Sequence, residues 1–578
     1  MNTSDTVQLK EPTPRKPLRL WPGVVLAVLL ALLRYVAPVV APALMMYAVL
    51  GGVVGALLIV LWWLVFSRAR WFERLGAVAL MVAALFAASR VVDKSIAGGA
   101  MGMLFPIMAI PILGVAFVAW AVATRRLSDG VRRATMVATI LLACGAWALI
   151  RTGGFSGDFK NDFHWRWTET PEERLLAQAG HEPLTRPPAA AAAKTGADWP
   201  GFRGAGRDGI VHGVRIKTDW TASPPAQMWR QPIGPAWSSF AVAGDLFYTQ
   251  EQRGDEEVVA CYKMSTGEPV WKHRDNARFW ESNAGAGPRA TPTLNNGRVY
   301  SLGGTGILNV LDATDGAVVW SRNAAGDTGA KTPIWGFSGS PLVVGDLVVV
   351  AASGALAAYD LATGKPRWTG PKGGEGYSSP QLVSINGVPQ ILLVRGGGAA
   401  SLSPADGKLL WEHAWKGYPI VQPAQTADGD VLLSVSDSSG IRRLAVTNGN
   451  GGWSVKERWT SIGLKPYFND FVVHKGHAFG FDGSMLACIN LEDGKRKWKG
   501  GRYGNGQLVL LADQDILMVL SEQGEVALVG ATQDEFRELA RFPAIKGKTW
   551  NHPVLAGDVL LLRNGEEMAA FRLTLAGS

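Results

Sequence analysis

Cysteine is scarce in this chain, and the placement of the few cysteines excludes several kinds of site. The 578 residues include three cysteines, Cys144, Cys261 and Cys488, with no vicinal pair, no Cys-x-x-Cys motif and no Cys/His cluster. A disulfide framework, a clustered zinc site and a haem c attachment are therefore not expected. A domain as large as the C-terminal part of the chain can bury enough apolar surface to fold without disulfides.

Acidic residues are rare in the first 150 residues, where five apolar segments follow one another. The segments are Leu20–Ala37, Ala43–Phe66, Leu75–Val92, Met103–Ala123 and Ala134–Ile150. Each is close to the roughly 20 residues that a helix needs to cross a bilayer. A cleavable signal peptide would explain only the first of them. The pattern predicts a five-helix transmembrane domain over residues 20–152, preceded by a cytoplasmic tail over residues 1–19.

The net charge of +9 has two interpretations, nucleic-acid binding or membrane topology. Basic clusters precede the first apolar segment and separate the second from the third and the fourth from the fifth. They contain Lys10, Arg15, Lys16 and Arg19, then Arg68, Arg70 and Arg74, then Arg125, Arg126, Arg132 and Arg133. This alternation follows the positive-inside rule. It predicts a multi-pass protein of the bacterial inner membrane with a cytoplasmic N-terminus, a periplasmic C-terminal domain and no nucleic-acid partner.

Arg34 lies inside the first predicted span, whereas Arg90, the other charge within the stated bounds, lies at the very end of the third. One interpretation makes Arg34 a functional intramembrane group, such as part of a quinone site. The other places it near the helix end, where its side chain extends to the interface, and the position favours this second interpretation.

Residues 153–197 connect the two halves of the chain. The aromatic residues of Phe155–Trp167 predict an interfacial belt directly after the last span. Thr170, Pro171 and Glu173 have the spacing of a capping box at the start of a short helix. Arg186–Ala197, rich in Pro and Ala, is typical of a linker, although its alanines could also extend a helix.

Internal repeats determine the fold class of residues 198–578. A small residue or Asp, a polar turn with Gly and then a Trp recur along the chain. The copies end at Trp271, Trp320, Trp368, Trp411, Trp459 and Trp498, with spacings of 49, 48, 43, 48 and 39 residues. Each spacing fits one propeller blade of about 40–50 residues.

Each repeat divides into four short strands separated by tight turns. The inner strands are expected to begin near Phe240, Pro292, Pro341, Pro380, Pro423, Asp470, Leu508 and Pro553. The eighth blade ends without a Trp strand, and Gln227–Gln231 can supply it from before the first blade. With this strand in place the eighth blade is complete and the ring is closed, so no sheet edge stays open between the first and last blades.

These repeats resemble the pyrroloquinoline quinone (PQQ)-like repeat of quinoprotein dehydrogenases and of the BamB lipoprotein of outer-membrane protein assembly. The likeness covers about Asp198 to the C-terminus. It implies an all-α transmembrane bundle followed by an all-β, eight-bladed propeller, in which the Trp docks between blades. The motif is structural and does not report bound PQQ. A five-span anchor before a propeller also looks like membrane-bound glucose dehydrogenase, which delivers electrons to ubiquinone.

Two functions are compatible with this resemblance. The first is a binding or scaffold module of the cell envelope, with envelope proteins and the lipid bilayer as partners. The second is a PQQ-dependent dehydrogenase that oxidises a sugar or alcohol and passes electrons to membrane quinone. That enzyme would need PQQ with Ca²⁺ held by carboxylate and amide oxygens. No motif here aligns with the family's metal ligands, so the metal ligands stay unassigned.

The segments before the inner strands lie at one mouth of the propeller channel, where either function would be located. Polar and aromatic residues there suit a planar anionic ligand such as PQQ. The candidate cofactor-binding residues are Arg289, Trp335, Asn469, Arg502, Asn505, Trp550 and Asn551. With such a ligand bound there, Asp470 would be the base or an ion ligand and His552 a proton carrier. The alternative is that these side chains pack and hydrogen-bond the loops.

Overall fold

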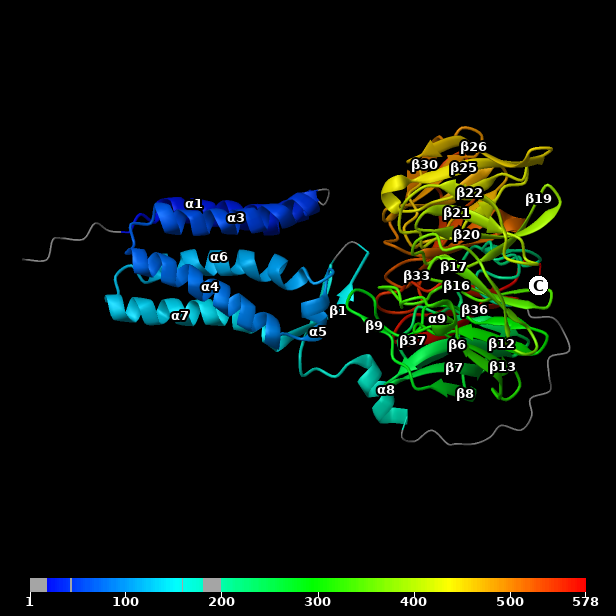
Figure 1. The fold of residues 1–578 in the computed structure, drawn as a ribbon, viewed down its shortest axis with the longest axis horizontal. Coiled ribbons are helices and arrows are strands. Elements are labelled where there is room, and N and C mark those ends of the chain that lie inside the picture. Colours follow the sequence, from blue (N-terminus) through cyan, green and yellow to red (C-terminus); the bar gives the residue numbers. More distant parts are fainter. Residues whose placement is uncertain (1–17, 42–43, 158–159, 180–198, 578) are drawn as a thin grey trace, which may run out of the picture. The chain divides into compact units, whose positions relative to one another are not determined.

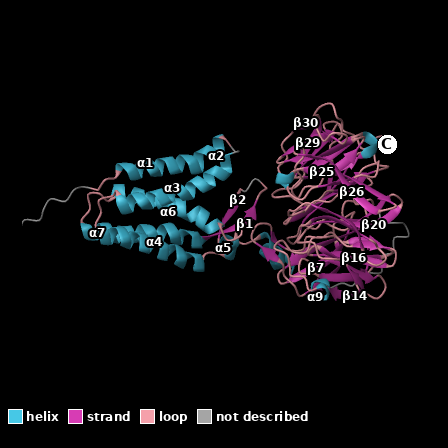
Figure 2. Ribbon diagram, turned by 45° about the horizontal axis from the view of Figure 1, so that its top comes forward, coloured by secondary structure: helices cyan, strands magenta, loops and turns pink. Residues whose placement is uncertain are grey.

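The computed structural model describes residues 18–41, 44–157, 160–179 and 199–577. The chain divides into two compact units. The helical unit comprises residues 1–154 and 161–168, and the propeller unit comprises residues 155–160 and 169–578. Figure 1 and Figure 2 show the helices of the first unit and the radiating strands of the second. The predicted linker at Arg186–Ala197 and most of the N-terminal tail lie outside the described residues.

Five helices of the first unit are long and apolar enough to cross a membrane, as predicted. They are α1 (Trp21–Ala31) continued through a π-helical turn (Leu32–Val36) into α2 (Ala37–Val40), α3 (Met45–Val65), α4 (Trp71–Val91), α6 (Leu104–Ala123) and α7 (Asp129–Gly145) with a 3₁₀ turn (Ala146–Leu149). The short α5 (Lys94–Gly98) precedes α6. Helix α6 is half buried and contacts α1, α3 and α7. Trp63 lies edge-on against Phe117, with ring centroids 4.8 Å apart.

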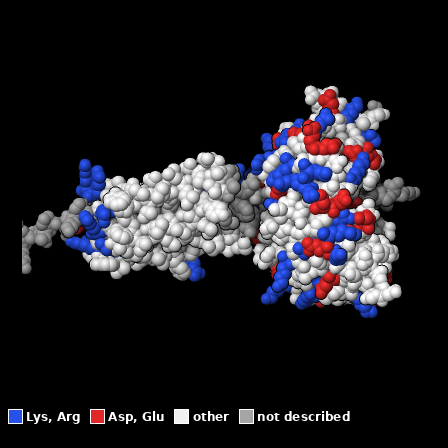
Figure 3. Space-filling view, turned by 90° about the horizontal axis from the view of Figure 1, so that it is seen from above, with Lys and Arg blue, Asp and Glu red and all other residues white. Residues whose placement is uncertain are grey.

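The fifth helix begins at Asp129, earlier than the predicted Ala134, because its basic first turns have a partner. Glu73 of α4 is buried and accepts hydrogen bonds from Arg132 and Arg133, each at 3.0 Å. Because Glu73 neutralises part of their charge, Arg132 and Arg133 can belong to the first turns of α7, directly before its apolar residues. Figure 3 shows Lys and Arg gathered at one end of the helical unit, whereas both signs of charge mix over the propeller.

The aromatic stretch after the last span contains a short two-stranded sheet, β1 (Ile150–Phe155) and β2 (Asn161–Trp165). The predicted capping box then opens α8 (Pro171–Ala179). Glu173 accepts the N–H of Thr170 at 2.6 Å, and Thr170 Oγ1 accepts the N–H of Glu173 at 3.0 Å. Within the propeller unit, Glu172 of this helix holds Arg278 at 2.8 Å.

The propeller has eight blades of four antiparallel strands each; the strands follow chain order in blades one to seven, and in blade eight the fourth strand comes from before blade one. Blade one is β5 (Ala241–Ala243), β6 (Leu246–Arg253), β7 (Glu256–Lys263) and β8 (Pro269–Asp275). Blade two is β11 (Thr293–Asn295), β12 (Arg298–Leu302), β13 (Ile307–Asp312) and β14 (Val318–Asn323). Blade three is β15 (Leu342–Val344), β16 (Leu347–Ala352), β17 (Ala355–Asp360) and β18 (Pro366–Thr369). Blade four is β19 (Gln381–Ile385), β20 (Val388–Arg395), β21 (Gly398–Leu402) and β22 (Leu409–Ala414).

The second half repeats the arrangement, with a longer outer hairpin in blade five. Blade five is β23 (Ala424–Gln425), β24 (Val431–Leu433), β25 (Ile441–Gly449) and β26 (Gly452–Ser461). Blade six is β27 (Val472–His474), β28 (His477–Asp482), β29 (Met485–Asn490) and β30 (Arg496–Gly500). Blade seven is β31 (Gln507–Leu511), β32 (Ile516–Leu520), β33 (Glu525–Gly530) and β34 (Glu538–Pro543). Blade eight is β35 (Val554–Ala556), β36 (Val559–Arg563), β37 (Glu567–Arg572) and β4 (Ala226–Pro232).

The repeated Trp joins most blades to the next, which explains the sequence motif. The indole Nε1 of Trp271 donates to the carbonyl of Ala313 in the following blade at 3.0 Å. Its ring lies on the next turn, where a Cβ at Gly316 would approach it to 2.5 Å and where φ is +74°. Glycine is therefore required there both for space and for backbone conformation. Trp411 differs, since blade five has no such turn, and donates to Gln390 Oε1 at 2.6 Å.

The ring closes as the sequence predicts. Strand β4 pairs antiparallel with β37, and Trp229 donates to the carbonyl of Met264 in blade one at 2.7 Å. The same segment that precedes β4 also contributes β3 (Ile210–Val211), which extends blade seven by a parallel strand on β31. The chain before blade one thus binds two blades at the end of the ring.

Candidate functional site

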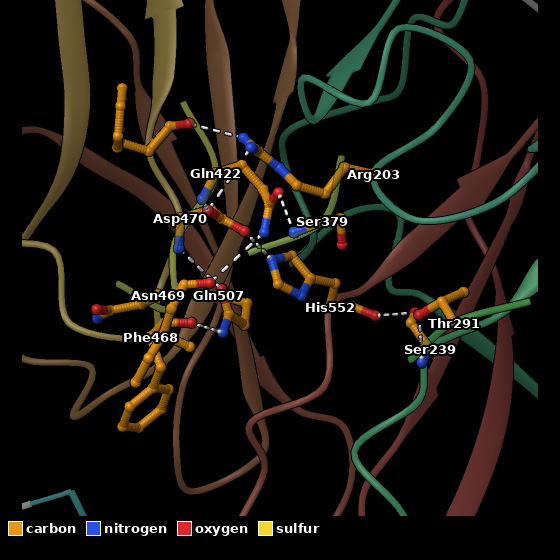
Figure 4. Close-up of polar contacts among 12 residues, drawn as sticks. Arg203, Ser239, Thr291, Ser379, Gln422, Phe468, Asn469, Asp470, Gln507 and His552 are labelled. Carbon is orange, nitrogen blue, oxygen red and sulfur yellow. Dashed lines mark hydrogen bonds and ion pairs between the residues drawn. The ribbon is translucent and has the colours of Figure 1, made fainter. Parts of the chain in front are cut away.

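A belt of hydrogen bonds joins residues at or just before the start of the inner strands, and Figure 4 shows part of it. In each case a backbone N–H donates to the side-chain oxygen of the equivalent residue in the next blade. The donors Ser239, Thr291, Ser340, Ser379, Gln422 and Asp470 meet Thr291, Ser340, Ser379, Gln422, Asp470 and Gln507, at 2.6–3.3 Å. Gln507 Nε2 then donates to the Trp550 carbonyl, and Ser239 Oγ to the His552 carbonyl, which closes the belt.

Asp470 and His552, the two candidate catalytic residues, meet in this belt. Asp470 Oδ2 lies 3.1 Å from His552 Nε2, while Oδ1 accepts the N–H of Gln422 at 2.6 Å. Both side chains are buried, with 2% and 9% of their residue surfaces exposed. Arg203 approaches the same carboxylate, with its Nη1 at 3.7 Å from Oδ1. Figure 4 shows the three side chains converging from different segments.

Burial and charge act in opposite directions on this cluster. Burial disfavours the Asp470 carboxylate, but Arg203, His552 and the Gln422 N–H outweigh it and hold the pKa of Asp470 below its usual value. Burial lowers the pKa of His552, and the attraction of Asp470 only partly offsets this. Asp470 is accordingly a paired anion beside a neutral imidazole, an arrangement that stabilises the belt.

Arg203 belongs to a segment that crosses the inner strands. The backbone of Trp199 exchanges hydrogen bonds with Val242 of blade one. Further along, Arg203 Nη2 donates to the carbonyl of Phe471 at 2.6 Å, and Arg207 Nη1 to that of Pro341 at 2.9 Å. Both arginines have a left-handed φ, 60° and 53°, which side chains other than glycine rarely adopt. These contacts span blades one, three and six, so the segment lies across the inner strands and supplies the counter-charge of Asp470.

An aromatic cluster lies at the channel mouth, in loops that precede the inner strands. Trp237 and Trp550 lie with ring centroids 4.8 Å apart, and Phe468 packs on Trp550 at the same distance. Lys548 Nζ lies 4.7 Å from the centroid of Trp550, a cation–π contact. Glu522, which is buried, accepts the indole N–H of Trp550 at 2.9 Å. We refer to these five residues as the mouth cluster.

The mouth cluster holds a stretch of the chain's own backbone. Within the propeller unit, Gly157 N–H donates to Glu522 Oε1 at 2.5 Å, and Lys548 Nζ donates to the carbonyl of Phe155 at 3.2 Å. The N–H of Phe155 donates to the carbonyl of Asn283 at 3.0 Å. A Cβ at position 157 would lie 1.7 Å from Asn505 Nδ2, so only glycine fits. The mouth therefore holds the end of β1 and the turn that follows it through main-chain contacts.

The remaining candidate residues are divided between the mouth and the loops. Arg289 is enclosed; its guanidinium donates to the carbonyls of Trp335 and Gly285 and to Glu281, at 2.9–3.3 Å. Burial lowers its pKa to about 10. Trp335 itself packs on Tyr377.

Arg502 and the three asparagines also have defined places. Arg502 is exposed and donates to Ser484 Oγ. Asn505 is buried beside Gly157, and its backbone N–H donates to Glu522. Asn551 donates to two backbone carbonyls, and Asn469 accepts the N–H of Tyr467. The structure thus brings Asn505 and Trp550 together at the mouth and Asp470 with His552 in the belt, and separates Arg502 from both.

The donor set does not form a ready site for PQQ and its cation. A tricarboxylate needs cationic donors, yet Arg289 is engaged with carbonyls and Glu281. Trp335 and Trp550 are each covered by another aromatic ring. Within the described ranges, no group of three or more His, Cys, Asp or Glu side chains is placed to hold a metal ion. Most side chains at the mouth and in the belt therefore bind one another, with Asn469 Nδ2 and Asn551 Oδ1 as exceptions.

Sequence reasoning missed five residues of this region, which are Arg203, Trp237, Phe468, Glu522 and Lys548. Arg203 sits in the compact Asp198–Gly204 stretch, whose Trp, Pro and Gly content signals a turn but not its target. Glu522 lies in a strand-connecting turn, and Lys548 precedes the last inner strand by several residues. Only the closure of the ring brings them to the mouth cluster and the belt.

Taken together, the closed ring and the belt define an eight-bladed β-propeller. The family model described as Outer membrane protein assembly factor BamB matches residues 221–392 and 378–576. The matched regions cover more than half of the chain, which therefore belongs to this family.

Among curated proteins, the chain is similar to the outer membrane protein assembly factor BamB of Shewanella oneidensis, 34% identical over 286 residues, covering 43% of this chain and 63% of the relative. It is also 30% identical over 168 residues to BamB of Burkholderia pseudomallei, covering 28% of this chain and 42% of the relative. The chain thus spans less than two thirds of the length of the curated relatives it matches.

Among solved structures, BamB from Moraxella catarrhalis aligns with a TM-score of 0.42 at 15% identity, covering 60% of this chain and 98% of the other.

Proposed function

We propose that this protein is a membrane-anchored scaffold of the bacterial cell envelope whose propeller binds extended segments of other envelope proteins at its channel mouth. The observation that carries the proposal is the contact of the mouth cluster with residues 155–157. Glu522 and Lys548 bind the main chain of that segment, at Gly157 N–H and at the Phe155 carbonyl. Main-chain recognition of this kind is independent of sequence and suits a scaffold.

The curated relatives support an envelope setting. They are named outer membrane protein assembly factors. A partner among the proteins of envelope assembly follows for this chain as part of the proposal. The five apolar helices would anchor it in the inner membrane, with the propeller in the periplasm and the N-terminus in the cytoplasm.

The proposed topology is tested with alkaline phosphatase fusions, because the enzyme is active only in the periplasm. A fusion after Glu169 should be active, and a fusion after Leu127, between the fourth and fifth spans, should be at least about tenfold less active. Equal activities at the two sites, or the reverse order, would contradict the orientation. Immunoblots of the fusions control for expression.

Binding at the mouth is tested with a peptide that carries the sequence of residues 153–157. It should bind full-length protein with Gly157→Val, which cannot hold its own segment, and binding should be lost when Glu522→Gln is added. Equal peptide binding with and without Glu522→Gln would contradict the proposal.

The second candidate function is the PQQ-dependent dehydrogenase that passes electrons to membrane quinone, with PQQ and Ca²⁺ as cofactors. One observation favours a small ligand. Among the described residues, Asn469 Nδ2 and Asn551 Oδ1 are buried without a hydrogen-bond partner. A polar ligand could supply the missing hydrogen bonds. Quinone absorbance retained after adding PQQ and Ca²⁺ to the purified protein, with dye reduction by sugars or alcohols, would favour this candidate over the scaffold.

A further inference from the structure

A groove lies between blades five and six, away from the channel mouth. One wall consists of residues 460–463 and Lys465, which connect the two blades, and the other of residues 493–496, which lead into β30. The cavity has a volume of about 600 Å³. Its size is that of sites which hold a whole ligand or peptide segment rather than one ion.

The groove has more positive than negative charge. Two carboxylates line it: Asp493 pairs with Lys495 at 3.1 Å, and Asp482 faces the other cations. Asp482, buried at the end of β28, accepts hydrogen bonds from Arg496 at 2.6 Å and from Lys499 at 2.7 Å. Lys465 Nζ lies 3.6 Å from the same carboxylate. Three cations thus share one anion, and no other carboxylate in the described part of the chain forms an ion pair with them. Two positive charges are left for a ligand to neutralise.

The strand along the groove is the most basic of the outer strands. Lys495, Arg496, Lys497 and Lys499 fall within five residues at β30. In the described residues β30 pairs only with β29, so its outer edge is open to a further strand. Ile462, in the facing wall, is 66% exposed. An open edge, cations and one apolar side chain are the elements of recognition of an extended peptide.

We propose that this groove binds an extended acidic segment of a partner protein. Carboxylates of the segment bind Lys465, Lys495 and Arg496, and an apolar side chain of the segment covers Ile462. This site is separate from the mouth cluster, so one partner can engage both sites or each can take its own.

A protein segment fits these observations better than phosphate or a lipid surface. A phosphate ion would fill a small part of the cavity and leave Ile462 exposed. A lipid surface attracts cations wherever they lie on a face, whereas Lys465 and Arg496 are gathered around the buried Asp482 in an open groove. The groove and the strand edge together favour a chain that runs along them.

The test uses the full-length protein in neutral detergent and a fluorescein-labelled peptide of alternating Glu and Val. Fluorescence anisotropy should show saturable binding that falls about tenfold with Lys465→Gln combined with Lys495→Gln. Lys408→Gln is the matched control, since Asp406-Gly407-Lys408 occupies in blade four the place of Asp493-Gly494-Lys495 in blade six. It should leave binding unchanged, and the same peptide with Gln for Glu should not bind.

Four results would overturn the proposal: no saturable binding, an equal loss in the control variant, displacement of the peptide by inorganic phosphate at matched concentration, or stronger competition by phosphatidylglycerol vesicles than by unlabelled peptide. The last two would assign the groove to phosphate or to a lipid surface. None of these results alters the binding of the residue 153–157 peptide to the mouth. The proposal for the groove and the proposal for the mouth can therefore be refuted independently.

Discussion

Replacing Asp470 by Asn is expected to lower the free energy of unfolding of the propeller by about 3 kcal/mol, because it leaves the buried Arg203 without its counter-charge. Arg203 is 2% exposed and cannot turn to water. Its hydrogen bonds to the Asp208 and Phe471 carbonyls remain. The expected loss of unfolding free energy is therefore at the lower end of the range for a broken buried ion pair. Chemical denaturation of the full-length protein in detergent measures the change.

Two further variants separate this charge effect from a general disturbance. Asp346→Asn removes an exposed carboxylate of blade three that pairs with Arg367, and should cost less than about 1 kcal/mol. Arg203→Met combined with Asp470→Asn should recover part of the loss, since no unpaired cation is left. A loss below about 1 kcal/mol in Asp470→Asn alone would show that the belt does not depend on the pair.

Glu257 should make the propeller less stable as the pH rises. This carboxyl is 4% exposed between blades one and two and accepts the N–H of Gly304 at 2.9 Å. Burial raises the pKa of Glu257 to about 7, and the negative charge of Asp275 adds to the rise. The hydrogen bond from the Gly304 N–H and the positive charge of Arg289 lower the pKa in part. The folded state therefore holds the proton more tightly than the unfolded state. Between about pH 4.5 and 7 the free energy of unfolding should fall by about 3 kcal/mol.

The matched variants are Glu257→Gln and Glu256→Gln. Glu257→Gln keeps an acceptor for Gly304 and removes the titration, so it should flatten this slope and stabilise the protein above pH 7. Glu256 is the preceding residue of β7, half exposed and paired with Arg274, and its replacement should leave the slope intact. Urea titrations at several pH values provide the comparison, and identical slopes for Glu257→Gln and the unmodified protein would refute the assignment.

The blades could be predicted from the sequence because their determinants are local. The Gly of each turn and the Trp of each outer strand lie within a few residues of one another, and the Trp packs on the next repeat at a fixed spacing, as Trp271 does on Gly316. Hydrophobicity and alternating basic loops likewise locate the five long helices. Blade five shows the limit, since its missing turn redirects Trp411 to Gln390.

The site was only partly predictable because its contacts join distant residues. The sequence singles out Asp470 and His552 as candidates, but their partner Arg203 is more than 250 residues earlier in the chain. Glu522 carries no motif, and the contact with Gly157 depends on a segment from before the propeller. Arg289 has the residue type expected for anion binding, yet its guanidinium is already satisfied by carbonyls, which no sequence pattern reveals.

The measurement that tests the mouth most directly is the affinity of a fluorescein-labelled peptide with the sequence of residues 153–157 for full-length protein with and without Gly157→Val. A Cβ at position 157 would overlap Asn505, so the variant should release its own segment and bind the peptide with a dissociation constant of about 0.1–1 mM. The unmodified protein should bind at least about tenfold more weakly, because its own segment competes, and Glu522→Gln in the variant should abolish binding. Equal affinities for the unmodified protein and Gly157→Val, or binding that persists without Glu522, would contradict an extended-segment site at the propeller mouth.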